Sequence, residues 1–165
     1  MQLKKDDNRG FTLVEALVSL VILTIALAPT LALTNFALHI STSLRNNLVA
    51  AGLTQEGIEV VRALRDNNWL SGKYFNEGLG DDDAIMVYRA QWDSSSLIED
   101  DPNMKLKLNN GVYSYSIGND TPFSRVITIT RISPQELKIT STVSWQERGR
   151  SRSIQAESHL FNWKK

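Results

Sequence analysis

Apolar and polar positions are distributed very unevenly along this chain. Between Ala16 and Leu44 there is no Asp, Glu, Lys or Arg, and His39 is the sole titratable side chain of that run. A helix of about 20 apolar residues is long enough to cross the hydrocarbon core of a bilayer, where the backbone must satisfy its own hydrogen bonds. The pattern therefore predicts a transmembrane helix from about Leu13 to about Phe36, with His39 near its outer end.

A second stretch, from Ser41 to Arg65, has a helical period. Its apolar residues predict one buried face of an amphipathic helix, made of Leu44, Leu48, Ala51, Ile58, Val61 and Leu64. We expect the helix to end near Asp66-Asn67-Asn68. Gly52 and Gly57 each cost a helix about 1 kcal/mol relative to alanine, which predicts a bend or tight packing there.

From Trp69 onward the pattern changes to turn residues and alternating segments, which are typical of an antiparallel sheet with one buried face. We predict strands at Ile85–Trp92, Met104–Leu108, Val112–Ile117, Ser124–Ile132, Leu137–Trp145 and Ser153–Phe161. Leu137, Ile139, Val143 and Trp145 share one face, and Glu147-Arg148-Gly149-Arg150 is predicted to be a hairpin turn. The predicted fold class is α+β: a long N-terminal helix whose second half packs on a C-terminal antiparallel sheet, the head.

Composition narrows the range of functions. Lys plus Arg and Asp plus Glu balance at 18 each, which argues against a broad nucleic-acid-binding surface. The chain has no cysteine, so disulfides, thiolate metal sites and cysteine nucleophiles are excluded.

The head carries no evident nucleophile with a positioned base. His159 stands alone on a predicted strand and is expected to be exposed. We predict no enzyme, no catalytic residues, no cofactor and no metal site. A membrane-anchored enzyme would need a buried site with perturbed ionisable groups, for which the sequence offers no candidate.

Smaller features of the head each have two interpretations. Acidic loops at Asp81–Asp83 and Glu99–Asp101 offer oxygen ligands for Ca²⁺, but neither matches an EF-hand, and solvated loops explain them as well. The basic tip Arg148, Arg150, Arg152 either touches DNA phosphates or a partner, or is a charged hairpin that protects a sheet edge. The four tryptophans are interpreted as core or interface anchors, at Trp69, Trp92, Trp145 and Trp163.

The apolar run at the N-terminus has three interpretations. A cleaved signal peptide has a core of about 7–15 residues before an A-x-A-like site, and Ala26-Leu27-Ala28 fits that pattern. However, Pro29 would follow the cut, and the apolar run continues beyond it. An ordinary membrane anchor explains the hydrophobicity but not Glu15, a carboxylate at the start of the span that marks function by default.

The third interpretation rests on the run Arg9-Gly10-Phe11-Thr12-Leu13-Val14-Glu15-Ala16-Leu17 and the long apolar helix behind it. Here the chain resembles the bacterial type IV pilins and type II secretion pseudopilins. In that family a short basic leader ends in Gly, Phe usually follows, and Glu is the fifth mature residue. The run Gln55–Asp66 resembles minor members of the family.

The resemblance implies a processing pathway. A membrane aspartyl protease, the prepilin peptidase, cuts between Gly10 and Phe11 and methylates the new amino group of Phe11. Residues 1–10 are the leader, 11–40 the transmembrane and filament-core helix, 41–68 its amphipathic second half, and 69–165 the extracytoplasmic head. Glu15 of one subunit would pair with the Phe11 amine of a neighbour, and Pro29 would kink or locally melt the helix.

The implied function is that of a structural subunit, a minor pilin or minor pseudopilin of a type IV pilus or type II secretion filament. Its expected partners are other pilin subunits, the prepilin peptidase and the inner-membrane assembly platform. Lys4, Lys5 and Arg9 favour a cytoplasmic N-terminus in the bacterial inner membrane, with the head outside. The alternative is a competence-type pilin whose head binds DNA through Arg148–Arg152.

Overall fold

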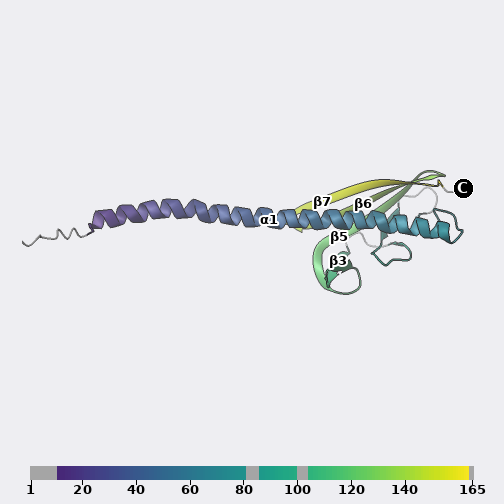
Figure 1. Cartoon of the computed structure of the whole chain (residues 1–165), viewed down its shortest axis with the longest axis horizontal. Helices are drawn as coiled ribbons and strands as arrows, with labels where there is room; N and C mark the ends of the chain where they lie inside the picture. Colours follow the sequence, from purple (N-terminus) through teal and green to yellow (C-terminus); the bar gives the residue numbers. More distant parts are fainter. Residues whose placement is uncertain (1–10, 81–85, 100–103, 164–165) are drawn as a thin grey trace, which may run out of the picture. The chain divides into compact units, whose positions relative to one another are not determined.

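The computed structural model describes residues 11–80, 86–99 and 104–163. The chain divides into two compact units, Met1–Ser43 and Leu44–Lys165. Its elements follow in the order α1 (Leu13–Leu70), β1 (Met86–Arg89), β2 (Ile98–Glu99), β3 (Lys105–Asn109), β4 (Val112–Ser114), β5 (Asn119–Ser133), β6 (Glu136–Glu147) and β7 (Arg150–Phe161). Figure 1 shows this succession of one helix and a sheet, which confirms the predicted α+β class.

The helix α1 ends two residues beyond the predicted stop at Asp66–Asn68, so that boundary was too early. Its last turn is closed by hydrogen bonds from Ser71 N to Asn67 O (3.0 Å) and from Lys73 N to Asn68 O (2.9 Å). The Asn68 side chain donates to the carbonyl of Glu77 at 2.8 Å. The same amide also donates to the Phe75 carbonyl, so Asn68 holds the following loop against the end of the helix.

Within the described residues the head contains a seven-stranded antiparallel sheet. The long strand β5 is central, because it pairs with β6 along one side and with both β1 and β3 along the other. The hairpin β6–β7 completes one edge. Figure 1 shows β6 and β7 on one side of α1 and β3 on the other.

The predicted strands were found, with revised ends. The segment β2 was missed, and β5 starts at Asn119 instead of Ser124. The hairpin predicted at Glu147–Arg150 is confirmed as a two-residue turn, since both Arg148 (φ 52°) and Gly149 (φ 74°) have positive φ. This is the turn geometry that matches the twist of paired strands.

Two apolar clusters form the core between the second part of α1 and the sheet. One joins Ile58, Val60 and Val61 of α1 to Leu137 and Ile139 of β6. The other joins Ala50 and Leu53 to Val143 and Trp145. The predicted inward face of β6 is therefore confirmed.

The predicted buried face of α1 was only partly right. Ile58 and Val61 are buried and Leu64 packs against the core. However, Leu44, Leu48 and Ala51 are exposed, Leu48 to 75%. Helical periodicity identifies apolar positions, but it does not say which of them the sheet covers. The sheet instead covers the neighbouring stripe that includes Ala50, Leu53, Gly57 and Val60.

Candidate functional site

The predicted processing site lies at the start of α1. Gly10 is outside the described residues, whereas Phe11 is described and 73% exposed. Thr12 precedes the first helical residue, and its hydroxyl oxygen accepts a hydrogen bond from the backbone N–H of Glu15 at 3.2 Å. The Thr12 carbonyl accepts one from Ala16 N at 3.1 Å. Thr12 is therefore the N-cap residue of α1.

Glu15 occupies the third helical position after this cap. Thr12-x-x-Glu15 is the sequence signature of a capping box, and a carboxylate in the first helical turn interacts favourably with the helix dipole. The cap bond uses the backbone N–H of Glu15, and the helix dipole favours a carboxylate at this position without any second subunit. The sequence-based prediction missed Thr12, although the spacing Thr12-x-x-Glu15 carries the signal of a helix cap.

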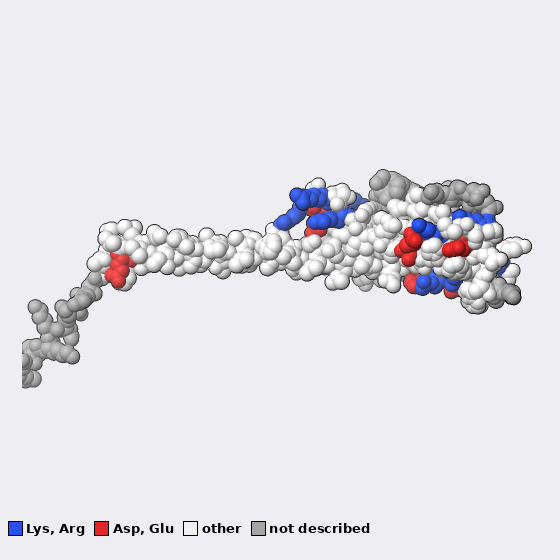
Figure 2. Space-filling view, turned by 90° about the horizontal axis from the view of Figure 1, so that it is seen from above, with Lys and Arg blue, Asp and Glu red and all other residues white. Residues whose placement is uncertain are grey.

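The helix segment after Glu15 is uncovered. Every described side chain from Phe11 to Thr42 is exposed, and Figure 2 shows the long uncharged surface of this segment in white. Among the described residues, α1 is the one helix long and apolar enough to cross a membrane. So much bare apolar surface requires lipid or other protein chains to cover it.

Pro29 lies inside α1, and the helix is continuous across it. The hydroxyls of nearby threonines donate to main-chain carbonyls, from Thr24 to Val21 O, from Thr30 to Ala26 O and from Thr34 to Thr30 O, at 2.8–3.0 Å. None of these three bonds goes to the carbonyl of Ile25, the group that Pro29 cannot serve. A kink or melting at Pro29 stays a prediction.

A buried arginine joins the second part of α1 to the sheet. The guanidinium of Arg125, on β5, donates from Nη1 to the Leu53 carbonyl and to Glu56 Oε1, each at 3.0 Å, and from Nη2 to the Ala90 carbonyl. The Arg125 side chain is fully buried, whereas that of Glu56 is 31% exposed. Sequence alternation places Arg125 on the inward face, but it could not reveal a partner 69 residues away.

Gly57 sets the distance between α1 and β6. A Cβ atom added at Gly57 would lie 2.4 Å from Ser141 Oγ and 3.2 Å from Ser141 Cβ. The predicted tight packing at Gly57 is therefore confirmed. Gly52 has nothing within 4 Å of the corresponding position, so it is not a packing residue.

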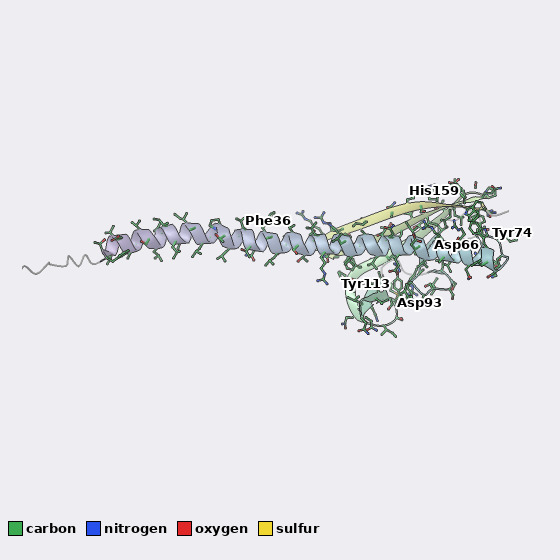
Figure 3. The ribbon with its side chains drawn as sticks, in the orientation of Figure 1. Phe36, Asp66, Tyr74, Asp93, Tyr113 and His159 are labelled. Carbon is green, nitrogen blue, oxygen red and sulfur yellow. The ribbon has the colours of Figure 1, made fainter. Side chains whose placement is uncertain are left out.

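Titratable groups of the head form surface networks. His159 is exposed, as predicted, and its ring nitrogens lie 2.6 Å from Glu136 Oε1 and 3.3 Å from Glu157 Oε1. Hydrogen bonds to Glu136 and then Glu157 raise the pKa of His159 above its ordinary 6.5. Figure 3 shows His159 above α1 and Tyr113 below it.

A buried tyrosine lies beside Arg125. Burial raises the pKa of Tyr115, whose hydroxyl donates to the Arg125 carbonyl at 3.2 Å. Within the described part of the chain no three His, Asp or Glu side chains are grouped so as to hold a metal ion. The acidic run Asp81–Asp83 and residues 100–101 of the other acidic loop lie outside the described residues.

The tryptophans differ in their surroundings. Trp145 is buried in the core, and Trp69 is partly buried, packing edge-on against Trp163 with ring centroids 4.9 Å apart. Trp92 and Trp163 are exposed to 61% and 71%. Only Trp145 is thus a fully buried core anchor.

Comparison with known proteins bears on the N-terminal segment. Residues 5–31 match the family described as prokaryotic N-terminal methylation motif. No curated protein and no solved structure gives a significant match to the chain. A helix of this kind followed by an antiparallel sheet is the layout of a pilin-like protein.

The match at residues 5–31, which overlaps the first part of α1, supports the resemblance to type IV pilins drawn from Arg9 to Leu17. The motif family is structural and not catalytic. The exposed apolar helix and the motif together are consistent with membrane anchoring and with a subunit that assembles with other pilins.

Proposed function

We propose that this chain is a minor pilin or minor pseudopilin, a structural subunit of a type IV pilus or type II secretion filament. The prepilin peptidase cuts it after Gly10 and methylates the amino group of Phe11. The observation that carries the proposal is the methylation motif at residues 5–31, which overlaps a segment, residues 11–42, whose side chains are all exposed. Such a segment needs lipid before assembly and neighbouring helices afterwards.

The proposed orientation has the N-terminus in the cytoplasm and the head outside the bacterial inner membrane. Its support is the basic leader with Lys4, Lys5 and Arg9, because cytoplasmic flanks of membrane helices are enriched in Lys and Arg. The proposed organisation is leader 1–10, membrane and filament-core helix 11–40, second helix half 41–68 and head 69–165.

The exposed stripe on the second part of α1 supports a role in assembly. Leu44 and Leu48 are exposed to 57% and 75%, although they lie in the unit that contains the head. Large apolar side chains left uncovered next to one another mark an interaction surface. We assign this stripe to contacts with helices of other subunits, alongside the peptidase and the inner-membrane assembly platform as partners.

In the filament, Glu15 pairs with the methylated amine of Phe11 on a neighbouring subunit. An unpaired carboxylate among apolar helices is strongly penalised, so this pair selects the register between subunits. The local cap at Thr12 supplies a competing explanation for Glu15, and the two explanations predict different variants to fail.

The experiment measures how much of the protein enters sheared filaments in its native host. Glutamine replaces glutamate well in a capping box, because it also accepts a backbone hydrogen bond, but it has no charge for the Phe11 amine. We expect Glu15→Gln to reduce incorporation strongly and Thr12→Ala to leave it intact, with cleavage after Gly10 retained in both. Normal incorporation of Glu15→Gln together with failure of Thr12→Ala would refute the charge pairing and favour the cap.

A further inference from the structure

One end of the head is basic, and filament assembly as proposed makes no use of it. The basic end consists of Arg45 on α1 and the three arginines of the β6–β7 hairpin, Arg148, Arg150 and Arg152, all of them exposed. We propose that the basic end binds the headgroups of anionic phospholipids while the subunit is still anchored in the membrane. The proposal rests on membrane anchoring by α1, but not on the type of filament that follows.

Strand register shows where the hairpin arginines lie. Trp145 is opposite Arg152, and Glu147 is opposite Arg150. Opposite residues of an antiparallel pair project from the same face of the sheet. Trp145 packs against α1, so Arg150 and Arg152 are on the face of the sheet that α1 covers, and Arg148 occupies the turn between the strands.

The direction of β6 places this hairpin beside Arg45. Leu137, at the start of β6, shares a cluster with Ile58 and Val61, whereas Trp145 shares one with Ala50. The strand therefore runs toward the beginning of the second unit. Two more residues of strand extend about 7 Å, a distance that a helix covers in four to five residues. Five residues before Ala50 on α1 is Arg45, which therefore lies near the hairpin. Figure 2 shows Lys and Arg gathered at this end of the head.

Chain connectivity favours a lipid partner over a nucleic acid. Arg45 is the first charged residue after the uncharged run Ala16–Leu44, and it follows Phe36 by nine residues, a reach of about 14 Å in a helix. Tethering so close to a membrane span gives lipid headgroups a high effective concentration at the basic end. The chain as a whole is neutral, so its surface has no general cationic excess for DNA.

Attraction of this kind is reversible. Each arginine near an anionic membrane surface strengthens binding about fivefold, and the effect decays within about 10 Å at 0.1 M salt. The basic end would hold the head against the membrane and release it when the subunit moves into a filament. Replacing the three hairpin arginines by glutamine should then weaken the head–lipid contact by about 10²-fold.

The test uses the full chain in lipid nanodiscs with a fluorescent dye on a single cysteine. The protein has no native cysteine, so Ser151→Cys, between Arg150 and Arg152, labels the hairpin alone. Ser71→Cys, beyond the C-terminal end of α1, is the control position. A quencher carried on lipid headgroups reports contact, in discs of phosphatidylcholine alone or with phosphatidylglycerol added.

We expect quenching at Ser151→Cys to increase when phosphatidylglycerol is present, and to fall back at high salt or in the R148Q/R150Q/R152Q variant. The variant R62Q/K73Q/K138Q removes the same charge elsewhere in the second unit and should quench like the parent. Equal quenching in both lipids, or an equal loss in the two triple variants, would overturn the proposal. So would tight binding of a short DNA duplex at the hairpin without any response to phosphatidylglycerol.

Discussion

Gly57 offers the sharpest test of how α1 packs on the sheet. A Cβ atom there would approach Ser141 Oγ to 2.4 Å and Arg125 Cδ to 3.3 Å, whereas at Gly52 it would meet nothing within 4 Å. Both sites lie inside α1, so replacing either glycine by alanine gains the same helix propensity, about 1 kcal/mol. The difference between the two variants therefore isolates the packing cost.

The size of that cost follows from the crowding. One extra carbon in a well-packed core costs about 1–3 kcal/mol, so Gly57→Ala should be less stable than Gly52→Ala by about that amount. Gly52→Ala itself should stabilise the protein by up to about 1 kcal/mol. Removing the nearest atom with Ser141→Ala in the Gly57→Ala background should restore most of the loss. Ser141 Oγ is buried with no hydrogen-bond partner among the described atoms, so its own removal leaves no broken bond.

The assay is urea unfolding of the full chain in detergent, followed by the fluorescence of its tryptophans. Trp145 packs in the affected core and reports loss of the contact between α1 and the sheet. If Gly57→Ala matches Gly52→Ala in stability, α1 does not lie against Ser141 as described. If Ser141→Ala fails to rescue Gly57→Ala, the crowding comes from another neighbour.

Three further predictions concern the head. Removing Arg125 in an Arg125→Met variant should cost about 3–5 kcal/mol, because the buried carbonyl of Ala90 loses its charged donor, and unfolding curves should show a larger loss than for Glu56→Gln. Since the folded-state pKa of His159 lies above 6.5, the stability from its protonated form is present below pH 6.5 and is lost as pH rises through the folded value. An NMR titration of His159 should give a midpoint above 6.5, and loss of Glu136 should lower it; an unchanged midpoint would contradict the ion pair. Gly149→Ala should destabilise the hairpin by about 1–2 kcal/mol, because φ at this position is 74° and a side chain is strained there. Thermal unfolding of the variant would measure this loss.

Sequence patterns predicted the helix and the strands better than they predicted which elements and residues pair with one another. The alternation of Leu137, Ile139, Val143 and Trp145 identified β6, since one face of that strand is apolar except for Ser141. The short strand β2 has two residues, too few for any alternation. The first residues of β5, Asn119 and Asp120, are typical turn formers, yet they pair with Leu108 and Lys107 of β3.

The helix α1 shows why burial and long-range contacts could not be predicted from the sequence. Leu44 and Leu48 have the spacing of a buried face, but burial depends on where the sheet lies, and the sheet is built from residues distant in sequence. The contact of Arg125 with Glu56 could not be predicted either. A charged residue at an inward position indicates that a partner exists, but the sequence does not identify a partner 69 residues away. At the N-terminus the reverse holds, since Thr12 and Glu15 interact locally and their spacing alone would have predicted the cap.

The most direct test of a pilin-like role is the intact mass of the protein extracted from its native membrane. Cleavage and methylation by the prepilin peptidase predict a chain that begins at Phe11 and carries one added methyl group. A chain that still begins at Met1, or one cut after Ala28 as a secretory signal peptide would be, would contradict it.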